Sequence, residues 1–471
     1  MKIAFIHYHL KTGGVTTVLR QQVEAVLGTC DVFVLTGAPP ESSFPCHLVH
    51  IPGLGYDRPD QNRLAPEDVA ASIIKAINQK WKSGCDLVHV HNPTLAKNRN
   101  FLIILKALQN RKIKLFLQIH DFAEDGRPLA YFSEDEYVQD SHYGVINSRD
   151  YNILLESGLK KKGLHKISNT IKPFNLSPAG VIPEKFVLYP IRALRRKNIG
   201  EAILISLFFK NNETLAITLP PNSPADIKSH SAWKVFVKEK NLNVVFEAGL
   251  THKFSELVMS ARSLITTSIT EGFGFSFLEP WTAKKFLWGR KLPEICHDFE
   301  TKGIRLDHLY TRLAVPVEWL GKEKLFGTWQ ACVRKAYAMF SIIIDETKIA
   351  NAFKKVTAND TIDFGLLDES FQKTIISHVL SDQANRDRLI RLNPFLSDPG
   401  DVSDKEKLIQ NNMNAVLLNY NKTIYRERLV DIYSRVVNNN VCHKIDKKVL
   451  LSKFLTLEDF SLLKWCEYAE E

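Results

Sequence analysis

The segment YPIRALRRKN, residues 189–198, concentrates positive charge directly after a short apolar run. Arg192 and Lys197 stand five positions apart, with Arg195 and Arg196 between them. Guanidinium and ammonium groups form strong charge-assisted hydrogen bonds with phosphate oxygens, and arginine can do so through two parallel N–H donors. The segment is therefore a candidate pyrophosphate site, and its alternative interpretation is a solvated basic loop.

The segment TEGFGFSFLEP, residues 270–280, combines two glycines with two carboxylates. Gly272 and Gly274 allow backbone N–H groups to face a ligand, while Glu271 and Glu279 lie eight positions apart. Because one carboxylate accepts two hydroxyl donors at once, such carboxylates suit the vicinal diols of a sugar or a ribose. The simpler interpretation of Glu271 is a carboxylate that caps a helix.

Near the start of the chain, FIHYHLKTGGVTTVLRQQ, residues 5–22, places Gly13 and Gly14 between an expected strand and an expected helix. Glycines allow a tight turn or a close approach, and the first turn of a helix presents unpaired N–H groups and a positive dipole end. Two interpretations stay open: an anion binds there, or the loop merely needs positive φ angles.

The elements that position these residues follow from the alternation of apolar strands with helical patterns through the first 150 residues. That rhythm predicts a parallel sheet wrapped by helices. The expected strands are Lys2–Tyr8, Asp31–Thr36, His47–Ile51, Asp86–His91, Lys114–Ile119 and Tyr143–Asn147, and the expected helices are Thr16–Leu27, Pro66–Lys80 and Lys97–Asn110.

The pattern restarts after a polar stretch at 168–185 that contains proline and glycine. Strands are expected at Phe186–Tyr189, Thr214–Thr218, Asn243–Glu247 and Ser263–Thr267, with helices at Glu201–Phe208 and Lys253–Ala261. The repeat predicts an α/β protein with two Rossmann-like domains that face each other across a cleft. Ligands in such sheets bind outside the carboxyl ends of the strands, where the segments quoted above lie.

The domain boundaries predicted from this pattern are 1–180 for the first domain, 186–345 for the second and 346–471 for a mostly helical region that braces both. Within that last region, residues 363–396 are expected to be helical and to face solvent. Residues 417–437 form a strong amphipathic pattern that predicts a helix.

Composition narrows the class of protein. The 471 residues are 45% hydrophobic and 24% charged, as in ordinary globular proteins, and no run reaches the roughly 18 apolar residues of a membrane-spanning helix. The net charge of +10 comes with short basic runs and no recognition helix, so we expect no nucleic-acid partner. Seven scattered cysteines without CxxC spacing predict neither a disulfide framework nor a zinc site, and we expect a cytoplasmic protein.

Three of these motifs, together with a fourth that contains His120, resemble motifs of a known group of enzymes. The Glu-x7-Glu of EGFGFSFLE, the Arg-x4-Lys of IRALRRK, the early glycine pair of KTGGVTTV and the HD of LFLQIHDF occur in the order and at the approximate separations seen in GT-B-fold glycosyltransferases. They look most like family 4, the retaining group that includes sucrose and glycogen-type synthases. The resemblance covers about residues 1–290 and 410–435, and it implies a GT-B fold with a helical C-terminal extension.

The resemblance implies a role for each matching position. Arg192 and Lys197 would hold the donor diphosphate, and Glu279 would take the ribose hydroxyls. His120 would touch the transferred hexose near its 6-hydroxyl. Glu271 would hold that hexose together with the backbone amides of Gly272, Phe273, Gly274 and Phe275. Gly13 and Gly14 would approach the diphosphate from the first domain.

The resemblance further implies transfer of a hexose from a nucleotide-diphosphate sugar to a hydroxyl acceptor, with retention of configuration. The leaving group would be stabilised by lysine and arginine, so no metal and no other cofactor is expected, and no DxD motif is found where a metal-dependent transferase would carry one.

The acceptor side offers a further set of basic residues. Lys11 and Arg127, with Lys97 and Arg99, fall in loops of the first domain that should border the acceptor, and their charges favour an anionic one, although solvated loops would look the same. After Glu279 the chain departs from the family's usual Gly-Gly turn. Arg290 in that region is a candidate for another phosphate or carboxylate contact.

Other protein classes fit less well. KTGGVTTV lacks the GxGxxG spacing of a nicotinamide dehydrogenase, and GxxxxGK[ST] is absent. A disaccharide phosphorylase of the same fold remains an alternative because phosphate can use the same basic residues. A non-catalytic nucleotide-sugar-binding protein is the second alternative.

Overall fold

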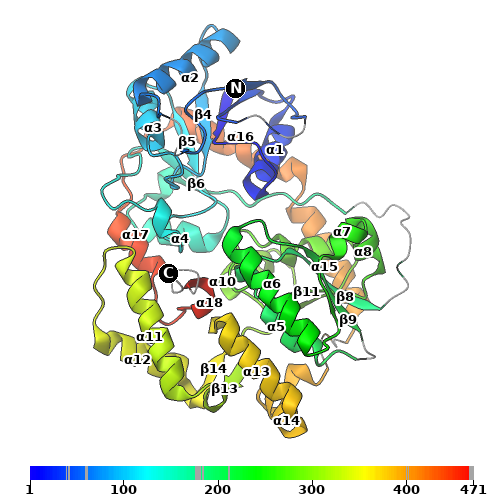
Figure 1. Ribbon diagram of the computed structural model, residues 1–471. Coiled ribbons are helices and arrows are strands. Elements are labelled where there is room, and N and C mark those ends of the chain that lie inside the picture. Colours follow the sequence, from blue (N-terminus) through cyan, green and yellow to red (C-terminus); the bar gives the residue numbers. More distant parts are fainter. Residues whose placement is uncertain are drawn as a thin grey trace. The chain divides into compact units, whose positions relative to one another are not determined.

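The computed structural model describes residues 1–38, 40, 43–58, 62–174, 182, 185–210, 213–398, 400 and 403–465 (Figure 1). The chain divides into two compact units. The first unit consists of Met1–Thr170 and Tyr420–Leu455, and the second consists of Ile171–Asn419 and the residues from Thr456 onward. The region from 346 to the C-terminus therefore contributes to both units.

The first unit is built on a parallel sheet of seven described strands in the order β3-β2-β1-β4-β5-β6-β7. Its strands are β1 Lys2–His7, β2 Asp31–Thr36, β3 Leu48–His50, β4 Leu87–His91, β5 Leu115–Gln118, β6 His142–Val145 and β7 Leu164–Lys166. Its helices are α1 Gly14–Val26, α2 Pro66–Lys80, α3 Phe101–Asn110, α4 Ser148–Glu156, α16 Lys422–Asn438 and α17 Lys447–Phe454. The six strands expected in this part of the sequence are present.

Alternate side chains of β1 enter different cores on the two faces of this sheet. Ile3 and Phe5 pack with apolar residues of α1 and α16, whereas Ala4 and Ile6 pack with residues of α2 and α3. Both faces are therefore covered, which explains why the strand reads as an almost continuous apolar run. Figure 1 shows α16, in orange, beside α1, in dark blue, so a segment 400 residues later in the chain completes this face.

The second unit contains a parallel sheet of five described strands in the order β10-β9-β8-β11-β12. Its strands are β8 Phe186–Arg192, β9 Thr214–Leu219, β10 Val244–Val245, β11 Ser263–Thr266 and β12 Leu287–Gly289, and β13 Ala314–Pro316 pairs with β14 Thr361–Asp363 in an antiparallel ribbon. Its helices are α5 Ile199–Ser206, α6 Pro224–Glu239, α7 Ala248–Thr251, α8 Phe254–Ser260, α9 Glu279–Thr282, α10 Pro293–Glu300, α11 Lys322–Ala338, α12 Glu346–Val356, α13 Glu369–Ser381, α14 Gln383–Leu392, α15 Lys405–Asn419 and α18 Leu462–Trp465.

The expectation that residues 363–396 face solvent is wrong for their central helix. α13 buries Phe371, Ile375 and Ile376, and it contacts α5. Its polar residues on the opposite face made the sequence look solvated, but the i, i+4 and i+5 spacing of the buried residues forms an apolar stripe. None of the described helices combines the length and the apolar character needed to cross a membrane.

A buried carboxyl group in the first unit makes stability depend on pH. Glu124 is fully buried, and the hydroxyl of Tyr137 donates to its Oε1 at 2.9 Å. Burial raises the pKa of Glu124 to about 7. The folded chain therefore holds a proton that the unfolded chain releases near pH 4.5, so this contribution to stability is present below pH 4.5 and is lost as the pH rises through 7.

We expect Glu124→Gln to stabilise the protein at pH 8, on the order of 3 kcal/mol, and to change stability little at pH 4.5, because glutamine accepts the same hydrogen bond without carrying a charge. Urea unfolding at the two pH values measures the difference. Glu136→Gln, at an exposed position, is the matched control. An equal effect of Glu124→Gln at both pH values would contradict the burial of an ionisable carboxyl.

Candidate active site

A lysine and a glutamate meet at the carboxyl ends of two adjacent strands of the second unit. β8 is followed by a 3-10 turn, Arg195–Lys197, and β11 is followed by the loop that begins the EGFG segment. Lys197 Nζ donates to Glu271 Oε1, and Arg196 Nη1 lies 3.3 Å from Glu271 Oε2. The Lys197 and Glu271 side chains are only 13% and 10% exposed. The structure thus brings together two motifs that lie 74 residues apart in the sequence.

Charge and burial act in opposite directions on this pair. Burial disfavours the Glu271 carboxylate, but Lys197 and Arg196 outweigh it and hold the pKa of Glu271 below its usual value. Burial lowers the pKa of Lys197, and Glu271 offsets part of that decrease. A largely buried cation is therefore held just beyond the end of β8, where a ligand oxyanion could share it with Glu271.

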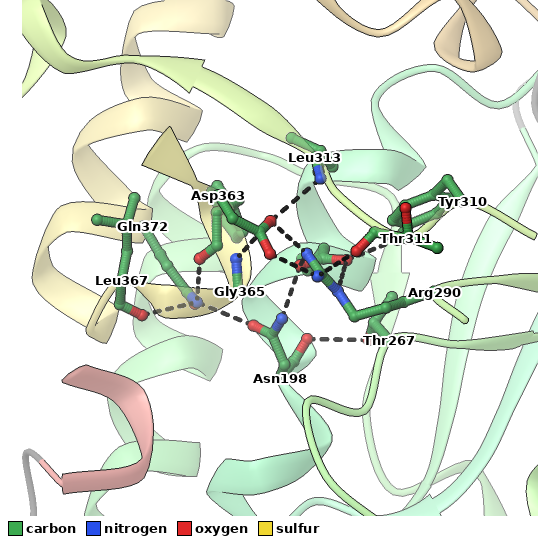
Figure 2. A network of polar contacts seen from close by, with 12 residues as sticks. Asn198, Thr267, Arg290, Tyr310, Thr311, Leu313, Asp363, Gly365, Leu367 and Gln372 are labelled. Carbon is green, nitrogen blue, oxygen red and sulfur yellow. Dashed lines mark hydrogen bonds and ion pairs between the residues drawn. The ribbon is translucent and has the colours of Figure 1, made fainter. Parts of the chain in front are cut away.

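The backbone on either side of the Lys197 side chain is fixed by hydrogen bonds. The carbonyl oxygen of Lys197 accepts from the hydroxyl of Tyr189 at 2.6 Å and from that of Thr267 at 3.1 Å. The Thr267 hydroxyl also lies 3.0 Å from the carbonyl oxygen of Asn198 (Figure 2). Asn198 has a φ of 53°, in the left-handed region, which ends the 3-10 turn and opens α5.

Asn198 is in turn held by one nearby and one distant side chain of the second unit, and Figure 2 shows the distant one, Gln372. Its Nδ2 donates to Glu201 Oε2 and its Oδ1 accepts from Gln372 Nε2, both at 2.8 Å. Glu201 and Gln372 are fully buried, and Gln372 comes from α13. The position of Lys197 therefore depends on contacts with a helix 174 residues further along the chain.

Arg290 is the centre of the same network. Its Nε and Nη2 donate to Glu201 at 2.8 and 2.7 Å, and its Nη1 and Nη2 donate to Asp363 at 2.7 Å. The remaining Nη1 donor lies 3.3 Å from the carbonyl oxygen of Thr311. All five N–H donors of the guanidinium are thus taken by the protein. The hypothesis that Arg290 contacts a ligand phosphate or carboxylate is wrong, because the group is buried between two carboxylates of its own unit.

Arg192 is the last residue of β8, and its Nη1 donates to the carbonyl oxygen of Pro220 at 2.8 Å, just beyond the end of β9. Glu279 opens α9, and although the residue as a whole is exposed, burial around its carboxyl group raises the pKa of Glu279 to about 7. Within the described ranges its carboxylate has neither a hydrogen bond nor an ion pair. Arg192 thus has a backbone partner, and Glu279 contributes a carboxyl group that has no hydrogen-bond partner among the described residues.

The loop between Glu271 and Glu279 has a mixed role. Phe273 is buried and packs against Phe299, so its side chain belongs to the core. Gly274 has a φ of 88°, and a Cβ there would lie 2.9 Å from the Phe277 ring, so glycine is required by the fold itself. Phe275 begins a second 3-10 turn and is partly exposed. The backbone of this loop, rather than its aromatic side chains, is what it offers to a ligand.

In the first unit, His120 follows β5 and is 8% exposed. Its Nε2 lies 2.9 Å from His91 Nδ1, and its backbone N–H donates to Asn92 Oδ1 at 2.7 Å. Burial lowers the pKa of His120 to about 4, against a smaller opposing effect of Asp121. The imidazole is therefore neutral at pH 7 and can exchange hydrogen bonds with a sugar hydroxyl without carrying charge.

The glycine pair at the start of α1 does not need left-handed backbone. Gly13 has a φ of 175°, which is extended, and neither glycine has a φ in the left-handed region. A Cβ on Gly14 would meet no atom within 4 Å. The interpretation that the loop merely needs positive φ angles is therefore wrong, and both residues are exposed at an N-terminus without a side-chain cap.

The basic residues expected near the acceptor differ in their surroundings. Arg127 pairs with Asp121 at 2.6 Å, and Arg99 pairs with Asp135 at 2.6 Å. Lys11 and Lys97 are exposed. The two arginines are thus ion-paired with carboxylates of the protein itself.

Several residues of the site had no signal of their own in the sequence. Thr267 and Gln372 act through contacts between distant segments, and Asn92 connects the ends of β4 and β5 with a φ of 52°. The role of Asn198 could have been predicted from the sequence, because an asparagine directly before a helix commonly adopts a left-handed or capping conformation.

Comparison with known proteins adds one relative in sequence and several in structure. No family model matches the chain. Mannosylglucosyl-3-phosphoglycerate synthase of Petrotoga mobilis is 24% identical over 533 aligned positions, which cover 97% of this chain and 98% of the relative.

Two solved structures have a similar arrangement of elements. HepE (Alr3699) of Anabaena, in complex with UDP-glucose, superposes with a TM-score of 0.53 at 12% identity and covers 92% of this chain and 99% of its own. A glycosyltransferase of Rickettsia africae gives a TM-score of 0.52 at 11% identity, with coverage of 93% and 99%. Together with the two parallel sheets and their helices, these likenesses show that the chain has an α/β GT-B fold with a helical C-terminal part.

Proposed function

We propose that the protein is a retaining glycosyltransferase that moves a hexose from a nucleotide-diphosphate sugar to a hydroxyl of an anionic acceptor. The observation that carries the proposal is the cluster of Lys197, Arg196 and Glu271 at the carboxyl ends of β8 and β11. Open α/β sheets bind ligands at this edge. The GT-B fold, the UDP-glucose bound to HepE and the name glycosyltransferase given to the Rickettsia africae protein support it.

The chemistry that this cluster supports is departure of a nucleoside diphosphate. As the bond between the sugar and the β-phosphate breaks, negative charge grows on the phosphate and positive charge on the anomeric carbon. Lys197 and Arg192 would stabilise the phosphate, and fixed cations do so without reorganisation at the moment of reaction. Glu271 would accept hydrogen bonds from the hexose hydroxyls and release Lys197 to the phosphate when the donor binds.

Other residues would hold the rest of the donor. The carboxyl group of Glu279 suits the two ribose hydroxyls. The neutral imidazole of His120 suits the hexose 6-hydroxyl, because its Nδ1, the nitrogen not bonded to His91, would either donate to that hydroxyl or accept from it, according to the tautomer. The leaving phosphate would deprotonate the acceptor on the same face of the sugar, which retains the anomeric configuration.

The sequence relative supports an anionic acceptor. The product named for the Petrotoga mobilis enzyme is a glycoside of phosphoglycerate, and its chain aligns with this one over almost the full length of both. We infer that the acceptor here is likewise a glycoside or hydroxy acid that carries phosphate and carboxylate groups.

We also propose that the reaction needs no metal ion. Full transfer activity is expected in excess EDTA, because Lys197 and Arg192 supply the charge that Mg²⁺ would otherwise provide. Initial rates with and without EDTA, after gel filtration into metal-free buffer, measure this. Strict dependence on added Mg²⁺ would contradict the proposed phosphate site.

The glycine pair gives a second test. We expect Gly14→Val to lower transfer at least about 10-fold while leaving thermal stability unchanged, because its Cβ meets no protein atom but would stand beside the first amides of α1. Affinity for the nucleoside diphosphate, measured by calorimetry, should stay the same, since Lys197 and Glu279 lie in the other unit. Unchanged kinetics would mean that the glycines do not approach the donor.

The proposed function itself is tested by ligand-induced stabilisation followed by turnover. A ligand that binds only the folded state raises the melting temperature by mass action, so UDP, GDP and ADP should rank by affinity. The sugar nucleotides of the best base are then assayed with a phosphorylated glycoside. Sugar-phosphate release with inorganic phosphate and no nucleotide would instead identify a phosphorylase, and binding without turnover would identify a binding protein.

A further inference from the structure

A hollow lies at the carboxyl ends of β1, β2 and β3 of the first unit. It encloses about 790 Å³ and is lined by residues that follow β1, β2 and β3. Pockets of this size suit a ligand of one or two sugar rings with substituents. The side chains that the argument uses are those of His9, Lys11, Tyr56, Asp57, Arg58 and Arg63.

The charges around this pocket are mostly positive. Asp57 is a carboxylate in its lining, and it is already engaged, because Arg63 Nε lies 3.0 Å from its Oδ2 and the backbone N–H of Arg99 donates to the same oxygen at 3.0 Å. Lys11 and Arg58 are exposed, and in the described part of the chain neither side chain has an ion pair or a hydrogen bond. Two uncompensated cations therefore face the same hollow.

The backbone that precedes Arg58 is held in place by a buried asparagine. Asn98 Nδ2 donates to the carbonyl oxygens of Gly53 and Gly55, each at 2.7 Å. Because a single buried side chain holds the carbonyl groups of Gly53 and Gly55, this part of the pocket wall is preformed. A preformed wall lowers the ordering cost of binding.

A row of rings connects the pocket with His120. The Tyr56 ring meets His9 edge to face with centroids 5.0 Å apart, and His9 lies 5.4 Å from His7. His7 lies 6.1 Å from His91, which stacks on His120 at 5.1 Å. All of these residues belong to the first unit. Three ring contacts therefore link His9 in the pocket lining to the histidine that the proposed function puts beside the transferred hexose.

We propose that this pocket binds the phosphate ester of the acceptor, with Lys11 and Arg58 as its two charged contacts. Arginine presents a planar fork to a phosphate, and lysine adds a compact charge. The sugar of the acceptor would then extend from the pocket toward His120, which leaves its hydroxyl free to react. This inference rests on the proposed function, and it names the part of the chain that selects an anionic acceptor.

The test compares two acceptors that differ only in the phosphate. Glucosyl-3-phosphoglycerate and glucosylglycerate are assayed with the same nucleotide sugar, and kcat/KM is measured for each. For the unmodified chain we expect a preference for the phosphorylated acceptor. In Lys11→Gln and in Arg58→Gln that preference should fall at least about 10-fold, through KM for the phosphorylated acceptor, because each loses one charge-assisted contact.

Lys75→Gln, an exposed lysine on α2, is the matched control and should keep the full preference. We expect the variants to fold normally because both side chains are exposed, and thermal unfolding verifies this. If the unmodified chain transfers hexose but Lys11→Gln and Arg58→Gln keep its preference, the pocket assignment is wrong and the proposed function stands. If the unmodified chain releases nucleoside diphosphate with neither acceptor, both are wrong.

Discussion

Lys197→Ala and Arg192→Ala are each expected to lower acceptor-dependent turnover by about 100-fold or more, because each removes a fixed positive charge from the departing diphosphate. The effect should appear mainly in kcat, since the charge on the phosphate is greatest in the transition state. Steady-state kinetics with the preferred nucleotide sugar measures it.

Lys197 also partners Glu271, so a folding defect must be separated from a catalytic one. Lys197→Gln keeps an N–H donor toward Glu271 but removes the charge, and it should be as inactive as the alanine variant while melting close to the unmodified protein. Lys210→Ala is the matched control, because Lys210 forms an exposed ion pair with Asp398 in the same unit. Near-normal kcat in both Lys197→Ala and Arg192→Ala would overturn the assignment of the phosphate site.

Arg290→Met is expected to destabilise the second unit by about 3–5 kcal/mol, because it leaves the buried carboxylate of Glu201 and the partly buried carboxylate of Asp363 without their cation. Burial raises the pKa of Glu201 even when Arg290 is present. Without Arg290 that carboxyl should take up a proton more readily, so the loss should be smaller at pH 5 than at pH 8. Urea unfolding at the two pH values measures both effects.

Combining Arg290→Met with Glu201→Gln should recover part of the loss, because the double change removes an ion pair instead of leaving one partner charged. Arg305→Met, at an exposed arginine near Asp307, is the control and should change stability little. A folded Arg290→Met variant of normal stability that no longer binds nucleoside diphosphate would contradict the structural role, since that result would require a ligand contact.

The sequence predicts the parts of the fold whose signal is local. The apolar strands from Lys2 to Val145 are confirmed, and the amphipathic pattern of residues 417–437 becomes α16. β12 was missed because it is only three residues long, Leu287–Gly289, and is defined by pairing with β11. α6, Pro224–Glu239, was missed because its lysines and histidine obscure the apolar stripe, although Ser223 as N-cap and Pro224 in the first turn are standard start signals.

The sequence alone could predict site residues only where they lie close together in one motif. The spacing of Arg192 and Lys197 and that of Glu271 and Glu279 point to phosphate and hydroxyl recognition, and the structure pairs Lys197 with Glu271. The contact of Gln372 with Asn198 spans 174 residues, and nothing in either segment indicates the other.

Arg290 illustrates the opposite error. Taken alone, an arginine near a predicted phosphate site looks like a ligand contact. Only the fold reveals that Glu201 and Asp363 occupy its donors. The sequence shows that an arginine stands at this position, but it does not show which side chains the arginine contacts in the folded protein.

The most direct test of the account is a quantitative product analysis of the reaction between one nucleotide hexose and one phosphorylated glycoside acceptor. The account predicts that nucleoside diphosphate and a new glycoside form in equal amounts, in excess EDTA and without inorganic phosphate, and that NMR finds the donor's anomeric configuration in the new bond. Failure to form the glycoside with any of the UDP, GDP and ADP hexoses, or formation with the inverted configuration, would contradict it.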